Sequence, residues 1–177
     1  MGKRSDFKRV ARDAYDTPFE AVAPLLPHLP ARLDFNEPCA GAGVLIGHLG
    51  QAGHYCVSAS DIEPRGCGID AADARSADFH RGQMFVTNPP WSRPILHAII
   101  ENLSRQAPAW LLFDADWMHT RQAVPYLRKL RKIVSVGRIK WIPGTTMTGK
   151  DNCCWYLFDY STGHAEKIEF IGRGLAA

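Results

Sequence analysis

A glycine-rich turn between a short apolar segment and an amphipathic segment constrains this chain more than any other feature. Residues 33–37 (Leu-Asp-Phe-Asn-Glu) are predicted to form a strand, and residues 38–43 (Pro-Cys-Ala-Gly-Ala-Gly) follow it directly. Apolar residues within 44–49 then begin a helix. Because glycine lets the main chain approach a ligand closely, this order predicts an α/β unit that binds a ligand at its turn.

The remaining sequence alternates predicted strands with predicted helices. A short helix is expected to begin at Thr17 as its N-cap, with Pro18 in the first turn and Glu20 completing a capping box. Ser92 is expected to cap a second helix, and residues 119–130 are helical in character, although Pro125 must kink or split that helix. This order predicts an α/β fold with a mostly parallel sheet and a closing strand pair. The other strands are expected at residues 54–60, 84–87, 110–113, 133–141 and 153–160.

Bulk composition is that of an ordinary globular protein. The chain has 177 residues, 46% of them hydrophobic and 22% charged, which suits one domain over residues 1–177. The longest apolar runs are too short for a membrane span, and no signal peptide is recognisable. Five cysteines without C-x-x-C spacing support neither zinc nor a disulfide framework, so the cytoplasm is the expected compartment.

Basic residues are distributed unevenly. The net charge is only +3, yet no acidic residue occurs between Asp116 and Asp151. Residues 1–14, expected to form a loose basic arm, hold a second cluster. Such segregation favours a polyanion such as nucleic acid, although a solvated helix face and a frayed terminus would give the same pattern. The first interval holds Arg121, Arg128, Lys129, Arg131, Lys132, Arg138, Lys140 and Lys150.

The stretch 88–91, Asn-Pro-Pro-Trp, ends the predicted strand 84–87 abruptly. Asn88 and Pro89 each precede a proline, which disfavours helix, and the two prolines have a fixed φ and no N–H. The expected result is a stiff bend that presents the Asn88 oxygen and backbone carbonyls beside the flat face of Trp91. Acceptors next to an aromatic face suit a planar, nitrogen-bearing group, so this stretch is predicted to be a substrate pocket.

Asp61 lies about twenty residues beyond the glycine turn, at the end of the next predicted strand, where a carboxylate can bind ribose hydroxyls. In parallel sheets ligands bind beyond the carboxyl ends of strands, so the glycine turn, Asp61 and residues 88–91 are expected on one rim. Together they favour a nucleotide-like cofactor. A nicotinamide-dependent dehydrogenase would share the first two elements but would not need Asn-Pro-Pro-Trp.

These motifs resemble those of S-adenosylmethionine-dependent amino methyltransferases. Residues 37–43, Asp61, residues 78–79 (Asp-Phe) and residues 88–91 occur in the order of that family. Residues 88–91 match the Asp/Asn/Ser-Pro-Pro-Tyr/Phe/Trp signature of its N6-adenine DNA methyltransferase group. The resemblance extends over residues 15–160 and implies a Rossmann-like methyltransferase fold, with helices on both faces of the sheet, and S-adenosylmethionine as cofactor.

The resemblance also implies a role for each matching residue. Asp61 would bind the cofactor ribose, and Asp78 would accept from the adenine amino group with Phe79 against the ring. Asp70 and Asp73 compete with Asp78 for that role. Residues 15–18 resemble the segment that precedes the glycine motif, so Tyr15 and Thr17 are candidate cofactor ligands, with packing and helix capping as their alternatives. Glu37, Ala40, Gly41 and Gly43 would hold the methionine moiety.

Asn88 has a physical rationale independent of the family. The lone pair of an adenine amino group is delocalised into its ring, and acceptors at the Asn88 oxygen and the Pro89 carbonyl would favour a pyramidal, nucleophilic nitrogen. Most of the rate would come from orientation and preorganised dipoles. Pro90 completes the bend, Trp91 would stack on the base, and in a duplex the base must first flip out. A 5-methylcytosine mechanism is disfavoured, because the only Pro-Cys pair lies in the cofactor turn.

The leading prediction is methylation of adenine N6 in DNA. DNA cytosine N4, RNA adenine and protein glutamine are alternative acceptors, and a binding module without turnover is the alternative outside enzymes. Such DNA enzymes commonly carry a separate recognition region, for which this length leaves no room, so specificity is expected to be low, loop-encoded or supplied by a partner. The loop 143–152 is predicted to lie against the substrate backbone. The predicted nucleic-acid contacts are Arg93, Arg138, Lys140 and Lys150.

Overall fold

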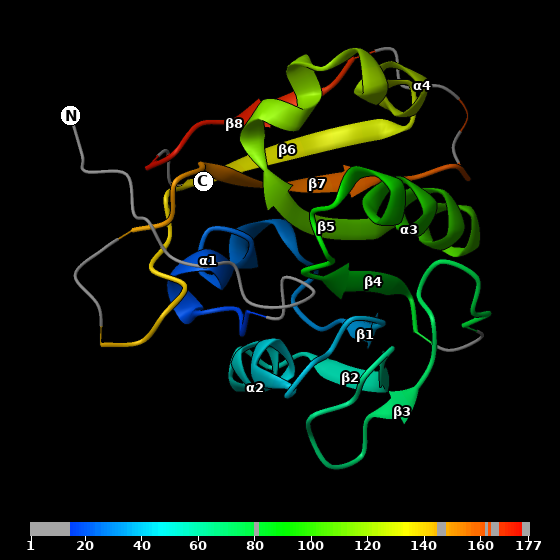
Figure 1. Cartoon of the computed structure of the whole chain (residues 1–177), viewed down its shortest axis with the longest axis vertical. Helices are drawn as coiled ribbons and strands as arrows, with labels where there is room; N and C mark the ends of the chain where they lie inside the picture. The colour runs from blue at the N-terminus through cyan, green and yellow to red at the C-terminus, as the bar shows by residue number, and fades with distance from the viewer. Residues whose placement is uncertain (1–14, 80–81, 145–147, 162, 164–166, 175–177) are drawn as a thin grey trace.

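One mixed β-sheet forms the centre of the protein (Figure 1). The computed structural model describes residues 15–79, 82–144, 148–161, 163 and 167–174, so the expected arm 1–14 and residues 145–147 of the loop 143–152 lie outside the described residues. The strands are β1 (Asp34–Glu37), β2 (Tyr55–Asp61), β3 (Asp70–Ala71), β4 (Met84–Thr87), β5 (Ala109–Asp114), β6 (Leu130–Gly137), β7 (Cys153–Phe158) and β8 (Glu169–Ile171).

The strand order is β3-β2-β1-β4-β5-β7-β6-β8, and Figure 1 shows it from β3 at the bottom to β8 at the top. Every pair of neighbours is parallel except β5–β7 and β7–β6, which are antiparallel. The predicted mostly parallel sheet with a closing antiparallel pair is therefore confirmed.

Short and medium helices cover both faces of the sheet. They are α1 (Phe19–Val22), η2 (Leu26–His28), α2 (Val44–Gln51), α3 (Arg93–Gln106), η3 (Ala115–His119), η4 (Arg121–Ala123) and α4 (Val124–Leu127). Side chains of a strand alternate between faces, so Leu111 and Phe113 of β5 pack with α3 and η3, whereas Trp110 and Leu112 pack with α1 and α2. The apolar stripe predicted for α3 is buried against the first of these faces.

One local prediction is wrong. Thr17 does not cap α1: the N-cap position is Pro18, without a side-chain cap, and the Thr17 hydroxyl instead accepts a hydrogen bond from Asn88. A tertiary contact here overrides a local helix signal. The split expected at Pro125 is confirmed: this proline stands at the start of the four-residue α4, which follows two 3-10 turns.

Seven of the eight described strands run in one direction, so their carboxyl ends meet at one edge of the sheet, here called the carboxyl rim. Since β7 is antiparallel to both β5 and β6, strand β6 runs in the same direction as β5 and also ends at this rim. Within the described residues no helix combines the length and the apolar character that a membrane crossing needs. At the rim, strands β1, β2, β4, β5 and β6 end in Glu37, Asp61, Thr87, Asp114 and Gly137.

Candidate functional site

A cavity of about 590 Å³ opens at the carboxyl rim, where the segments that follow β1, β2 and β4 converge. It is called the first cavity below. No group of three histidine, cysteine or acidic side chains in the described residues is placed to hold a metal ion. Most of the residues expected to bind a cofactor line this cavity together with part of the Asn-Pro-Pro-Trp stretch. Those lining it are Tyr15, Thr17, Glu37, Ala40, Gly41, Asp61, Asn88 and Pro90.

The glycine turn is held through its backbone. Gly41 and Gly43 have φ angles of 54° and 82°, which residues with a side chain rarely adopt. The Gly41 N–H donates to Asp61 Oδ2 at 2.8 Å, and the Glu63 N–H donates to Asp61 Oδ1 at 2.8 Å. Asp61 thus joins the turns that follow β1 and β2, and each carboxylate oxygen keeps a further lone pair for a ligand.

Glu37 places a carboxyl group beneath this turn. Its side chain is only 2% exposed, and its Oε2 atom has no hydrogen-bond partner among the described residues. Burial, followed by the charge of Asp61, raises the pKa of Glu37 well above its ordinary range. A buried oxygen without a donor is costly, so a ligand that brings a donor or a positive charge would be stabilised here.

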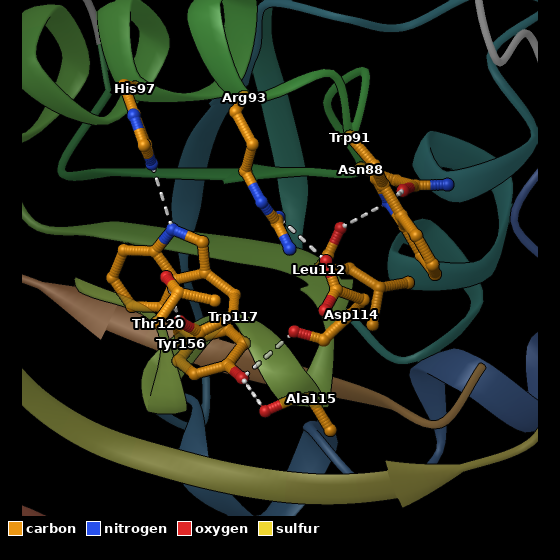
Figure 2. A network of polar contacts seen from close by, with 10 residues as sticks. All are labelled: Asn88, Trp91, Arg93, His97, Leu112, Asp114, Ala115, Trp117, Thr120 and Tyr156. Carbon is orange, nitrogen blue, oxygen red and sulfur yellow. Dashed lines mark hydrogen bonds and ion pairs between the residues drawn. The ribbon is translucent and has the colours of Figure 1, made fainter. Parts of the chain in front are cut away.

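The Asn-Pro-Pro-Trp stretch is held through its side chains (Figure 2). The Trp91 indole N–H donates to Asn88 Oδ1 at 3.2 Å and to the Leu112 carbonyl at 3.1 Å. The Asn88 amide nitrogen donates to Thr17 Oγ1 at 3.2 Å. An indole nitrogen can only donate, so Trp91 fixes which way the Asn88 amide points.

An aromatic cluster flanks Asn88. The Trp91 ring meets Trp141 edge to face with centroids 5.7 Å apart, and Trp141 lies 6.2 Å from the Tyr15 ring. Sequence reasoning did not assign Trp141, whose position at the end of a predicted strand gave no sign that it would contact Trp91. Together these rings build an apolar wall beside the amide.

The structure separates two predicted cofactor residues from this cavity. Asp78 and Phe79 line a second cavity, of about 690 Å³, together with Gly43. Phe79 packs edge to face against Phe85, with centroids 5.5 Å apart. Asp73 lines the first cavity instead, where hydrogen bonds from the Arg75 guanidinium lower the pKa of its carboxyl. Of the three aspartates weighed from sequence, Asp73 is therefore the one that lines the same cavity as Asn88.

The predicted nucleic-acid contacts differ in their surroundings. Arg93 forms an ion pair with Asp114 at 2.7 Å, and both side chains are largely covered, at 29% and 14% exposed (Figure 2). Its charge is thus directed at the end of β5. Arg138, Lys140 and Lys150 are exposed beyond the carboxyl end of β6, and the Lys140 N–H donates to Glu20.

The basic interval that looks continuous in sequence is divided between the two ends of β6. Arg131 and Lys132 lie near its amino end, opposite the carboxyl rim. Arg131 donates to the Asp159 carbonyl, and Lys132 pairs with Glu169 at 2.8 Å. These two cations lie at the end of β6 opposite the carboxyl rim, whereas Arg138, Lys140 and Lys150 lie at the rim end of the strand.

A second polar network braces the end of β5 (Figure 2). The Trp117 indole N–H donates to His97 Nε2 at 3.0 Å, and the Tyr156 hydroxyl donates to the Asp114 carbonyl at 3.1 Å. Burial, with the nearby Arg93 charge, lowers the pKa of His97, which favours the neutral imidazole that an accepting Nε2 atom requires. The rim segment that holds Asp114 is therefore fixed from two sides.

Comparisons with known proteins find likeness in three dimensions only. No family model and no curated protein matches this sequence. A Listeria monocytogenes protein described as a class I S-adenosylmethionine-dependent methyltransferase superposes with a TM-score of 0.62 at 10% identity, over 91% of this chain and 66% of that chain. The fold is that of a Rossmann-like methyltransferase.

Two further solved structures share this methyltransferase fold. A dimethyladenosine transferase from Plasmodium falciparum has a TM-score of 0.54 and 15% identity, over 86% of this chain and 63% of that chain. The M protein of the type I restriction enzyme EcoKI has a TM-score of 0.51 and 13% identity, over 86% of this chain and 46% of that chain. At these identities the likeness establishes the fold alone.

Proposed function

We propose that this chain transfers a methyl group from S-adenosylmethionine to the exocyclic N6 amine of adenine in DNA, with low or loop-encoded sequence specificity. The observation that carries the proposal is the Asn88 amide, held by Thr17 and Trp91 at the edge of the first cavity. The methyltransferase fold supports it, as do structural neighbours named as a dimethyladenosine transferase and as the M protein of a type I restriction enzyme.

The first cavity suits S-adenosylmethionine in size and in chemistry. Its volume of about 590 Å³ lies in the range of small-molecule sites. Asp61 would bind the ribose, and the unpartnered Glu37 oxygen would meet the positively charged methionine end, next to the backbone of the glycine turn. When bound, the cofactor supplies an electrophilic methyl group. Asp73, rather than Asp78, would accept from the adenine amino group.

Asn88 would orient the acceptor amine. Its Oδ1 atom accepts from Trp91 and keeps a second lone pair, which would take one amino hydrogen while the Pro89 carbonyl takes the other. Because the Asn88 amide is already fixed, the acceptor needs no reorganisation when the substrate arrives. The half-buried Trp91 ring would stack on the base, a contact worth about 1–3 kcal/mol.

RNA adenine is the second candidate acceptor, since one of the solved structures that share the fold is a 23S rRNA methyltransferase. Tritiated methyl transfer onto duplex DNA, single-stranded DNA, RNA and protein, followed by nucleoside analysis, separates the candidates. The proposal expects label in N6-methyladenine from DNA. Label confined to RNA, to N4-methylcytosine or to protein would overturn the DNA adenine assignment, and absence of label from every acceptor would overturn methyl transfer itself.

The exposed cations beyond β6 would contact the substrate backbone. Lys150→Ala should weaken DNA binding several-fold and reduce the slope of log affinity against log salt by about one, because each phosphate contact releases about one counterion. Arg128→Ala is the matched control, because this exposed arginine lies just before the amino end of β6, opposite the carboxyl rim. Fluorescence anisotropy across a salt series measures both, and equal slopes for the two variants would remove the loop from the interface.

A further inference from the structure

Arg65 lies directly against the glycine turn at the first cavity. Its backbone N–H donates to the Gly41 carbonyl at 2.9 Å, and a Cβ atom added to Gly41 would stand only 2.6 Å from Arg65 Nη2. The same Nη2 pairs with Asp16 Oδ1 at 2.9 Å. Arg65 therefore holds the turn after β1 through its backbone and the segment before α1 through its guanidinium.

The charges around this cavity are unbalanced. Its lining holds five carboxylates but only two guanidinium groups, those of Arg65 and Arg75. Arg75 is committed to Asp73, whose two oxygens lie 2.9 and 3.0 Å from its Nε atom. Within the described part of the chain Arg65 makes one ion pair, through one nitrogen, and a guanidinium carries five N–H donors. Arg65 is therefore the cation best able to take an anionic group of a ligand.

We propose that Arg65 binds the α-carboxylate of S-adenosylmethionine, with Asp16 holding the guanidinium in place. This inference rests on the proposed cofactor and is independent of the acceptor. Asp61 marks the ribose end of the cavity, and Asp16 directly precedes Thr17, the partner of Asn88. The sulfur of the cofactor joins its ribose to its amino-acid chain. With the ribose at Asp61 and the carboxylate at Arg65, the methyl-bearing centre would lie within the cavity that Asn88 also lines.

The charges that line the cavity require a cation such as Arg65 next to the α-carboxylate. An α-carboxylate that enters a cavity whose acidic side chains outnumber its guanidinium groups is repelled unless a cation meets it. A charge-assisted, two-pronged hydrogen bond from a guanidinium is among the strongest available. Among the described residues only one Asp16 oxygen is engaged by Arg65, so Asp16 and the buried Glu37 oxygen would together meet the α-ammonium group while Arg65 meets the carboxylate.

The decisive measurement is calorimetric titration of the full chain with S-adenosylmethionine and with its decarboxylated form. The second ligand keeps the adenosine, the sulfonium and the ammonium group and lacks only the carboxylate. The wild type should prefer the intact cofactor by on the order of tenfold to a hundredfold. Arg65→Met should lose that preference, binding S-adenosylmethionine more weakly while its affinity for the decarboxylated form is unchanged or higher.

Two matched variants complete the experiment. Arg75→Met, at the other guanidinium of the cavity, should keep the preference, and Arg65→Lys should restore part of it. Because the Arg65 side chain is 41% exposed, its replacement should leave the fold intact. An equal loss of affinity for both ligands in Arg65→Met would assign the guanidinium to bracing the turn, and an undiminished preference would place the carboxylate elsewhere. Either result would overturn the role proposed for Arg65 but not the assignment of S-adenosylmethionine as cofactor. A wild type that binds neither ligand would overturn both.

Discussion

The glycine turn after β1 and the proline turn after β4 stand side by side, because β1 and β4 are paired in the sheet. The first is built from backbone: glycines with positive φ and an N–H donated to Asp61. The second is built from side chains, with Asn88 held between Thr17 and Trp91. Two neighbouring strands therefore end in turns stabilised by different means.

The two turns also differ in what they leave open. In the proline turn both polar atoms of the Asn88 amide have partners within the protein. In the glycine turn the Glu37 Oε2 atom is buried without one. The first turn is complete before any ligand arrives, as a preorganised catalytic group requires, and the second is completed by a ligand. Substitutions in the two turns should therefore affect different steps.

Replacing the proline-turn amide should have the largest effect. Asn88→Ala removes the acceptor oxygen proposed to orient the amine, so the rate of methyl transfer should fall by about 10²–10³-fold, the usual effect of losing one preorganised polar group. Cofactor affinity should stay within about twofold, because the glycine turn is untouched. Single-turnover kinetics and calorimetry measure the two quantities separately.

Asn88→Asp is the matched control for that experiment. Aspartate keeps an oxygen that can accept from Trp91, and the Thr17 hydroxyl can turn to donate to the other oxygen. This variant should therefore retain much more activity than Asn88→Ala. If Asn88→Ala weakened cofactor binding as strongly as it slowed transfer, it would be wrong to assign methyl transfer to the proline turn and cofactor binding to the glycine turn.

Trp91→Phe should have an intermediate effect. Phenylalanine keeps an aromatic face for stacking but loses the N–H that fixes the Asn88 amide and caps the Leu112 carbonyl. We expect about a tenfold slower transfer at unchanged cofactor affinity, measured under single-turnover conditions. Trp141→Phe changes the neighbouring indole, which contacts Trp91 by its ring, and should slow transfer less. Equal losses in both variants would show that ring packing, rather than the indole N–H, matters.

Sequence reasoning succeeded where a local pattern determines the structure. The buried strand β4 was predicted at its observed bounds, because an apolar run ends there in two prolines. The two-residue β3 has both side chains exposed and gave no such pattern. Fold class and rim position followed from strand order, which is why the glycine turn, Asp61 and Asn88 were expected together.

The features of the site that sequence did not reveal depend on tertiary contacts. Thr17 has the local chemistry of a helix cap, yet its hydroxyl bonds a residue 71 positions away. Asp73 and Asp78 are equivalent in sequence and are separated only by the path of the loop after β3. The position of Arg65 depends on contacts with Asp16 and Gly41, from two other segments. The number of basic residues in the sequence likewise does not reveal that they are divided between the amino and carboxyl ends of β6.

The smallest predicted effect, a shift in stability, tests whether the glycine turn holds an unsatisfied group. The raised pKa of Glu37 means that the folded chain holds this proton more tightly than the unfolded chain does. Wild-type stability without ligand should therefore be greatest below the unfolded pKa and fall as the pH rises from there through the folded pKa. Glutamine cannot ionise, so Glu37→Gln should remove that fall.

Thermal unfolding between pH 4 and pH 8 measures this difference. Glu37→Gln should melt higher than the wild type at pH 8, by about 2–4 °C for each kcal/mol of relieved burial cost in a domain of this size, and the gap should close toward about pH 4. The same variant should bind S-adenosylmethionine more weakly, since it lacks the charge that the cofactor would meet. A gap that stays constant with pH would mean that Glu37 is satisfied within the folded chain, and the contrast between an open and a completed turn would fail.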